Sequence, residues 1–384
     1  VINPFDEAAD GMALLPFDAW EIDLLASGIE IVDTEGNRLP FQIVRELREY
    51  FLGVRLELGP RAERDVEVRF TGKALKDVPV DLLDDYFQGR YVSILTDGDA
   101  ESMREGAKPL AENAWENDWL SLGWDSAKGI TSLQDRNLDR ELLTPNALAG
   151  LLSPIYQCFP GGDRTGPAGF NFAQRTIPES REDVGRLESV EWVYSGDLSD
   201  LLVFRFACPG TEHYLLRLEI PKRPGRLEAR VNVTKTSVPD PEGLYAALPF
   251  IEAGGVWHLD KAGAAIRAGE DQLPGACGDY FLTQSGGALV GVDSGVAITL
   301  LDAPLVHIGG LNLWRFGKAE DVEKGGAMYN WLSNNKWEVN FPANCGGFYQ
   351  FRYRFEWGAA LCDPAQAIHR CRANQFDFLT LRTS

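Results

Sequence analysis

Histidine is scarce in this sequence, and the local motifs of several large enzyme classes are missing. The 384 residues include only 4 histidines, His213, His258, His307 and His369, so a histidine-rich metal centre would need most of them. No HExxH segment, GxSxG turn, Walker loop or strand-GxGxxG-helix segment is present. The chain therefore lacks the usual signatures of zinc proteases, α/β-type serine hydrolases, P-loop proteins and dinucleotide-binding domains, which argues against these classes.

Cysteine is also sparse and shows no paired spacing. The 6 cysteines form no CxxC motif, and only Cys362 and Cys371 lie near each other in the sequence. An even number permits disulfides, but in a chain of this length isolated cysteines are typical of buried positions. We therefore expect reduced thiols.

Basic residues and long apolar runs are in short supply as well. Lys and Arg number 37 against 57 Asp and Glu, a net charge of −20, which would repel nucleic acid and anionic membranes but not neutral sugars. The first residues, VINPFDEAAD, have no signal-peptide pattern. Asp293, Asp302, Pro304 and His307 interrupt the most apolar stretch, so no membrane span is expected. We expect a soluble protein and favour the cytoplasm.

Alternation of apolar and polar residues dominates the rest of the chain. Apolar residues at every second position predict strands with one face toward a core. Together with 39 glycines and 21 prolines, this pattern favours a chain of strands and turns. The clearest segments are 28–33, 54–58, 65–70, 214–220, 227–233 and 348–355.

Helical patterns are few. Residues 81–87 could form one or two turns, and Asp363 followed by Pro364 predicts the start of a helix. Because strands and helices do not alternate, a doubly wound sheet or an α/β barrel is improbable. The predicted fold class is all-β.

The expected organisation is two domains, 1–108 and 109–384, joined by a charged segment before residue 108. Acidic residues at 97–101 begin like a calcium loop, but Ser102 stands where glycine is needed, so we expect a solvated loop. The glycine-rich segment 159–169 lacks phosphate-loop spacing and predicts a surface loop.

One segment is unusually rich in aromatic and amide side chains. Residues 328–344 contain 2 Trp, 1 Tyr, 1 Phe and 5 Asn. Aromatic faces stack on sugar rings and amides hydrogen-bond to hydroxyls, so this segment is a candidate sugar-contacting surface. The alternative is that Trp331 and Trp337 belong to the core and the asparagines to turns.

Several segments in a fixed order resemble the C-terminal β region of family 38 glycoside hydrolases, the α-mannosidase group, over nearly the whole chain. The first group is VINPF at 1–5 together with 28–33 and 36–42, and the second is AEN at 111–113 together with 129–135 and 140–143. The third and fourth are the single segments 242–250 and 334–342. Leu248, Val339 and 345–347 depart from the family pattern, which indicates a divergent branch.

The resemblance implies a small β-sandwich followed by a large β-supersandwich of the galactose mutarotase type. It also implies that zinc, the nucleophile and the acid/base carboxylate lie on a separate N-terminal α/β barrel, so no catalytic or metal-binding residue is assigned to this chain. This chain would be a non-catalytic β region that braces the barrel of the same polypeptide and contributes to the rim of a pocket for a mannoside-like glycan.

Two other functions remain open at this stage. A free-standing sugar mutarotase or epimerase would need His213 or His307 to face an acid such as Glu338 in one cleft. A carbohydrate-binding module would stack sugars on Trp331 and Trp337. For any of these sugar-binding roles, the candidate contacts are Asn335, Trp337, Asn340 and Arg352.

Overall fold

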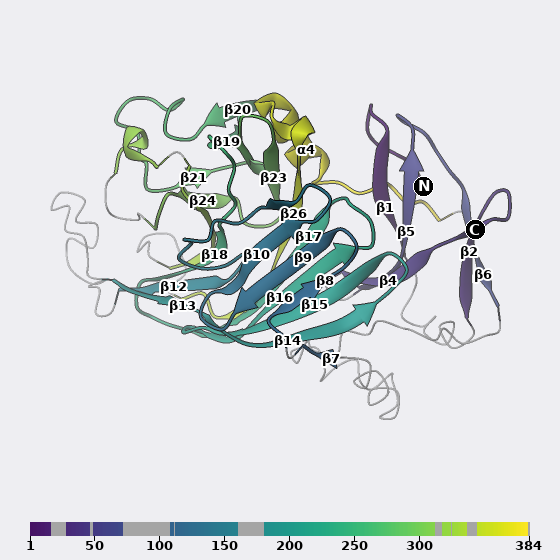
Figure 1. The fold of residues 1–384 in the computed structure, drawn as a ribbon, viewed down its shortest axis with the longest axis horizontal. Helices are drawn as coiled ribbons and strands as arrows, with labels where there is room; N and C mark the ends of the chain where they lie inside the picture. The colour runs from purple at the N-terminus through teal and green to yellow at the C-terminus, as the bar shows by residue number, and fades with distance from the viewer. Residues whose placement is uncertain are drawn as a thin grey trace.

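The computed structural model is built almost entirely from antiparallel strands, which confirms the all-β fold (Figure 1). The structure describes residues 1–16, 28–46, 49–71, 108–110, 112–159, 180–311, 317–323, 325–335 and 344–382. Each of the six segments with clear alternation lies on a strand, because period-two patterning lets one face of a strand pack against a core.

Two three-stranded sheets form the small sandwich, which lies to the right in Figure 1. Their inward side chains, among them Ala13, Ile31 and Val54, share one core. The sheets have the orders β1 (Ala9–Pro16), β5 (Glu49–Leu58), β4 (Phe41–Glu46) and β3 (Arg38–Leu39), β2 (Ile29–Asp33), β6 (Val66–Phe70).

The C-terminal segment of the chain returns to the small sandwich. Phe378 is buried in its core, and Ile2 forms an antiparallel bridge with Leu379. A Cβ built on Gly11 would lie 3.2 Å from the Phe378 ring, so the absence of a side chain at Gly11 lets the ring approach β1 closely. The two ends of the chain are therefore held together. The division at residue 108 stays a prediction.

The remaining sheets form the large sandwich. Its ten-stranded sheet packs on the main core, and side chains of two of its strands, among them Ala288 and Ala297, also pack with the C-terminal helix in a second apolar core. In order, its strands are β20 (Ala264–Arg267), β19 (Val256–Lys261), β22 (Gly286–Val290), β23 (Gly295–Leu300), β26 (Gly347–Gly358), β17 (Leu227–Lys235), β16 (Thr211–Pro221), β15 (Ser199–Ala207), β14 (Arg186–Ser195) and β7 (Lys108–Pro109).

Two further sheets of the large sandwich contribute side chains to the same core. The six-stranded sheet has the order β13 (Arg181–Val184), β12 (Pro154–Cys158), β18 (Glu242–Leu248), β25 (Met328–Asn334), β24 (Leu305–Ile308), β21 (Phe281–Leu282). The four-stranded sheet has the order β11 (Arg140–Glu141), β10 (Gly129–Asp135), β9 (Leu120–Asp125), β8 (Ala114–Glu116).

A single α-helix, α4 (Pro364–Ala373), is present in the described part of the chain, with short 3₁₀ helices η2 (Ala319–Asp321) and η3 (Ala359–Leu361). The predicted cap at Asp363 is confirmed, because its side chain accepts a hydrogen bond from the Gln366 backbone N–H at 2.9 Å. The predicted turn at 81–87, the acidic run at 97–101 and residues 160–169 of the glycine-rich loop lie outside the described residues.

Candidate functional site

Among the predicted sugar contacts, Asn335 is fully buried. Its amide N–H groups donate to the backbone carbonyls of Val238 and Asp240 at 2.9 and 3.1 Å, and its Oδ1 accepts from the Glu242 backbone N–H at 2.7 Å. The side chain therefore positions the start of β18. Trp337 and Asn340 lie outside the described residues.

Arg352 lies on β26 and pairs with Asp302. Its Nη2 lies 2.9 Å from Oδ1 and its Nε lies 3.1 Å from Oδ2, a two-pronged geometry that fixes the guanidinium plane. The described contacts of Arg352 and of Asn335 share no residue. The sugar-contact roles of the four predicted residues therefore remain predictions.

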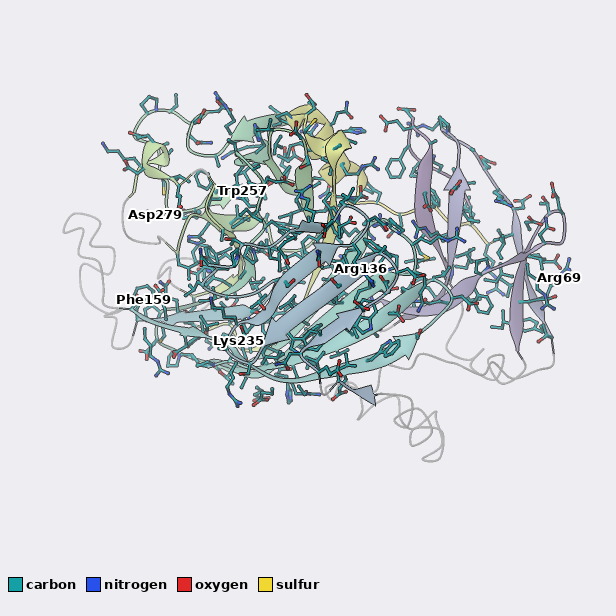
Figure 2. All side chains as sticks on the ribbon, viewed as in Figure 1. Arg69, Arg136, Phe159, Lys235, Trp257 and Asp279 are labelled. Atoms are coloured by element: carbon teal, nitrogen blue, oxygen red, sulfur yellow. The ribbon has the colours of Figure 1, made fainter. Side chains whose placement is uncertain are left out.

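A buried ionic cluster lies next to Asn335 in the large sandwich. The Lys235 ammonium lies 2.6 Å from the Glu242 carboxylate, and both side chains are 1% exposed (Figure 2 labels Lys235). The Tyr156 hydroxyl donates to the same carboxylate at 2.6 Å. Burial, reinforced by this hydrogen bond and the negative charge of Glu242, raises the pKa of Tyr156, so the phenol stays protonated.

The two histidines of the mutarotase hypothesis lie in different surroundings. His307 is fully buried, and its ring lies 5.2 Å from the Tyr245 ring and 5.1 Å from the Trp331 ring, measured between centroids. Trp331 is itself 3% exposed, so the core alternative is the correct one for this residue. His213, in contrast, lines a cavity of about 430 Å³ together with Asp183 and Glu188.

A second cavity, of about 410 Å³, lies between the small and large sandwiches, and we call it the inter-domain pocket. Its walls come from β1 and β5 of the small sandwich, from β16, β17, β26 and α4 of the large sandwich, and from the C-terminal segment. Five arginines and six carboxylates line it, together with two tryptophans. Residues from the whole length of the chain therefore meet in one polar site.

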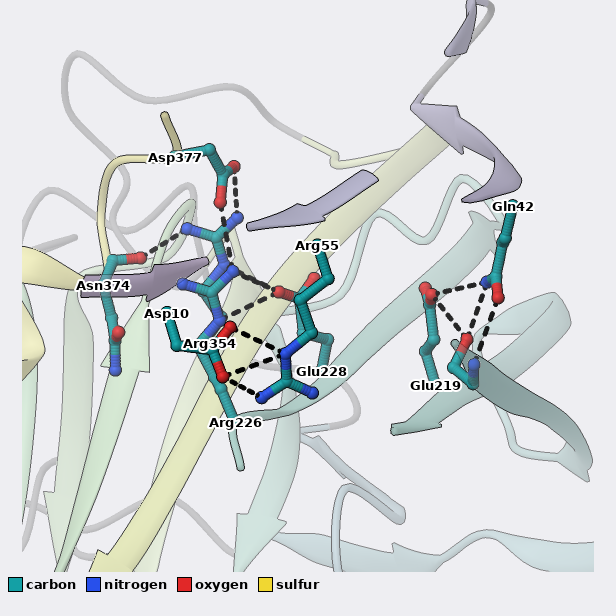
Figure 3. Close-up of polar contacts among 10 residues, drawn as sticks. Asp10, Gln42, Arg55, Glu219, Arg226, Glu228, Arg354, Asn374 and Asp377 are labelled. Atoms are coloured by element: carbon teal, nitrogen blue, oxygen red, sulfur yellow. Dashed lines mark hydrogen bonds and ion pairs between the residues drawn. The ribbon is translucent and has the colours of Figure 1, made fainter. Parts of the chain in front are cut away.

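The deepest charges of the inter-domain pocket form a network of ion pairs (Figure 3). Arg226 pairs with Glu228 at 2.6 Å and with Asp377 at 3.0 Å, and Arg354 pairs with Asp377 at 2.6 Å. Arg354 also donates to the Asn374 carbonyl at 2.6 Å. The network ties the hairpin before β17, the middle of β26 and the C-terminal segment to one another.

The charge state of Glu228 follows from its neighbours. Burial alone would raise the pKa of its carboxyl group, but the positive charges of Arg226, Arg354 and Arg230 outweigh burial and lower the pKa to about 2. Glu228 is therefore ionised at neutral pH.

The small sandwich meets this wall at Arg55 and at Gln42. Arg55 and Asp10 form an ion pair at 2.7 Å, and the Arg55 guanidinium lies against Gly225, where a built Cβ would lie 2.9 Å from Nη2. The Gln42 amide donates to the Ser199 hydroxyl at 2.6 Å and to Glu219 at 3.0 Å (Figure 3). The Gln42 hydrogen bonds join the two sandwiches, whereas the Arg55–Asp10 pair lies within the small sandwich.

An aromatic wall borders the same pocket. The rings of Trp119 and Trp357 stack with centroids 5.9 Å apart and an interplanar angle of 25°. The Trp357 indole N–H donates to Asp135 at 2.8 Å, and Trp119 is 2% exposed. Trp119 therefore supports Trp357 from behind, and Asp135 fixes the orientation of its ring.

The described residues offer no metal site and few reactive groups. Within the described ranges, no group of three or more His, Cys, Asp or Glu side chains could hold a metal ion. The six cysteines form no disulfide in the structure, and Cys277 and Cys362 are exposed, so the expectation of burial is wrong for these two. Burial raises the pKa of Cys208 and of Cys371 to about 12. No helix in the described part is long and apolar enough to cross a membrane.

The sequence did not predict the inter-domain pocket. Its charged residues come from five separate regions, at 10, 55, 135, 219–230 and 354–377, and a chain with 57 acids offers many such residues. One sequence pattern points to part of the pocket wall: in 348–357, aromatic residues alternate with Gln, Arg and Glu, and the segment ends in Glu356-Trp357. This alternation predicts a strand with one aromatic face and one polar face.

The two sandwiches and the pocket between them define an all-β protein, and two solved structures share its fold. One is an α-mannosidase from Enterococcus faecalis V583, with 11% identity and a TM-score of 0.59, covering 100% of this chain and 45% of that chain. The other is a protein in glycosyl hydrolase family 38 from Enterococcus faecalis, with 11% identity and a TM-score of 0.57, covering 99% of this chain and 46% of that chain.

These comparisons confirm the fold resemblance expected from the sequence segments. This chain spans about half the length of the two solved structures, at 45% and 46%. No protein-family model matches the sequence, and no curated protein matches it. At 11% identity the likeness shows a shared fold, and activity has to be argued separately.

Proposed function

We propose that this chain is a non-catalytic β region of an α-mannosidase-like glycoside hydrolase and braces a separate catalytic domain of the same polypeptide. The observation that carries this proposal is the fold match over 100% of this chain and only 45% of an α-mannosidase chain. Zinc and the reacting carboxylates would then belong to the other part of the hydrolase. This chain would supply shape and support.

The contacts between the sandwiches support a bracing role. The ion pairs of Arg226, Arg354 and Asp377 cross-link strands that are distant in sequence, and the Gln42 contacts join the sandwiches. Such a preorganised unit loses little conformational freedom when a catalytic domain docks on it. A rigid support can also keep pocket-lining loops at fixed positions around a glycan.

The first test uses the isolated chain with an aryl α-mannoside as substrate and measures bound zinc by elemental analysis. We expect no hydrolysis above background and much less than one zinc per chain. A purified chain that cleaves the α-mannoside with turnover, and loses this activity on chelation, would refute the proposal.

We propose that four residues support or form the rim of the substrate pocket in the complete hydrolase: Asn335, Trp337, Asn340 and Arg352. For Asn335 the buried hydrogen bonds favour a positioning role, through the start of β18. In the longest native polypeptide that carries this segment, Trp337→Ala should raise KM for the glycan. Phe348→Ala, on β26, serves as the aromatic control and should leave KM unchanged.

A second candidate function is sugar mutarotation, because His213 shares its cavity with Asp183 and Glu188 and so places an imidazole near carboxylates. The test is anomer exchange of glucose and galactose, followed by polarimetry with the pure chain. Faster exchange that His213→Ala abolishes and His307→Ala keeps would favour mutarotation at this cavity. Exchange at the uncatalysed rate would remove this candidate.

A further inference from the structure

The inter-domain pocket has the size and form of a small-molecule site. Its volume of about 410 Å³ lies within the roughly 300–1,000 Å³ that is usual for such sites. Both sandwiches contribute to its wall, so a molecule bound there would contact two domains at once. Domain interfaces are common positions for ligand pockets.

The end of β26 explains how aromatic and charged residues come together. The last pair between β17 and β26 is Leu227 with Phe355, so Glu356 and Trp357 extend beyond the pairing with β17. Both residues still pair with β23, and both line the pocket. Trp357 supplies an aromatic surface there, and Glu356 a carboxylate.

The polar groups near the opening are held in place and yet accessible. Arg370 pairs with Glu356 at 3.3 Å, with side chains 46% and 23% exposed. From the small sandwich, Arg55 pairs with Asp10, with side chains 26% and 40% exposed. Because these pairs fix the donors and acceptors before binding, a ligand could hydrogen-bond to them at a low entropic cost.

The charge balance selects the class of ligand. With five arginines and six carboxylates, the wall is nearly neutral, so it offers no net attraction for a phosphate or for a polyamine. A neutral sugar needs both donors and acceptors for its hydroxyls and an aromatic face for its C–H surface. The pocket has all of these.

We propose that the inter-domain pocket is a second, non-catalytic sugar site that binds an uncharged pyranose between Trp357, Glu356 and the Asp10–Arg55 pair. This inference goes beyond the proposed bracing function, because it assigns a ligand to the β region itself. Binding would join the two sandwiches through the ligand and would stabilise their contact by mass action.

The experiment is calorimetric titration of the full chain with methyl α-D-mannopyranoside, with inorganic phosphate and glycerol as alternative ligands. We expect saturable sugar binding with a Kd of about millimolar order, the usual range for one small polar ring. We expect Trp357→Ala to weaken it about tenfold and Glu356→Gln to weaken it about tenfold.

Matched controls lie elsewhere in the large sandwich. Tyr349→Ala removes an aromatic ring from the same strand, and Glu270→Gln neutralises a carboxylate that pairs with Arg267 at 2.5 Å. Both should keep the wild-type Kd. Glu356→Gln preserves the shape of the side chain and tests the site even where Trp357→Ala fails to fold.

Three outcomes would overturn the proposal: no saturable sugar binding, sugar binding that both pocket variants leave unchanged, or tighter binding of phosphate or glycerol than of the sugar. None of these results bears on the bracing function, because that proposal rests on the fold match and is tested by hydrolysis. Failure of one proposal is therefore distinguishable from failure of the other.

Discussion

Replacing Glu228 by Gln should destabilise the protein at neutral pH and should hardly affect it in acid. The carboxylate is surrounded by Arg226, Arg230 and Arg354, whose charges lower its pKa to about 2. A neutral amide keeps the shape of the side chain but leaves the guanidinium groups with one counter-charge fewer. Asp377 still pairs with two of them, so the fold should persist.

The size of this destabilisation follows from the pKa of the Glu228 carboxyl group. Lowering it from 4.5 to about 2 corresponds to about 3 kcal/mol of folding free energy at pH 7. Because the folded state has the lower pKa, this contribution is complete above about pH 5 and is lost as the pH falls toward 2. The expected cost of Glu228→Gln is about 3 kcal/mol at pH 7, about 2 kcal/mol at pH 3.5 and under about 1 kcal/mol at pH 2.5.

The assay is urea unfolding of both proteins at these three pH values, followed by tryptophan fluorescence and circular dichroism. Glu188→Gln is the matched control, because its carboxylate pairs with Arg186 at a more exposed position, where an ion pair contributes about 0–1 kcal/mol. A Glu228→Gln cost below about 1 kcal/mol at pH 7, or one equal at all three pH values, would refute the electrostatic reasoning.

Three other predictions follow from buried groups. Phe378→Ala should cost about 3–5 kcal/mol in urea unfolding because it empties the core of the small sandwich, and a cost under about 1 kcal/mol would contradict this packing. Lys235→Met should lower the free energy of unfolding by about 3–5 kcal/mol, because it leaves Glu242 buried without its cation. The Lys235→Met/Glu242→Gln double variant should recover part of that loss. Equal free energies of unfolding for the wild type and the single variant would contradict this prediction. At pH 8, a thiol reagent should modify exposed Cys277 rapidly and Cys371 only on unfolding, since burial raises the pKa of Cys371 to about 12; comparable rates in mass spectrometry would show that Cys371 is accessible.

Much of the fold could be predicted from local patterns, because these patterns have local causes. Period-two alternation placed the strands of both sandwiches, and Asp363 with Pro364 placed the start of α4. Alternation did not show that β16 would be buried on both faces, including most of Arg217. The residues that cover the polar face of β16 come from other parts of the chain, so the local pattern of β16 does not indicate them.

The candidate site was harder to predict, because it consists of long-range pairs. Arg55 with Asp10 and Arg354 with Asp377 have ordinary sequence surroundings, and nothing local distinguishes them from other charges. The amide-rich segment led instead to Asn335, which bonds to backbone groups of Val238, Asp240 and Glu242. Residue chemistry identified a sugar-compatible composition, but tertiary contacts decide which side chains a ligand can reach.

The most direct test of the central claim is the intact mass of the native polypeptide that carries this segment in its source cells. The segment itself has a mass of 42.5 kDa and spans 45% of a related α-mannosidase fold. We predict a species of roughly twice this mass that hydrolyses an α-mannoside and contains zinc. A native species of 42.5 kDa, without a catalytic partner domain, would contradict the account.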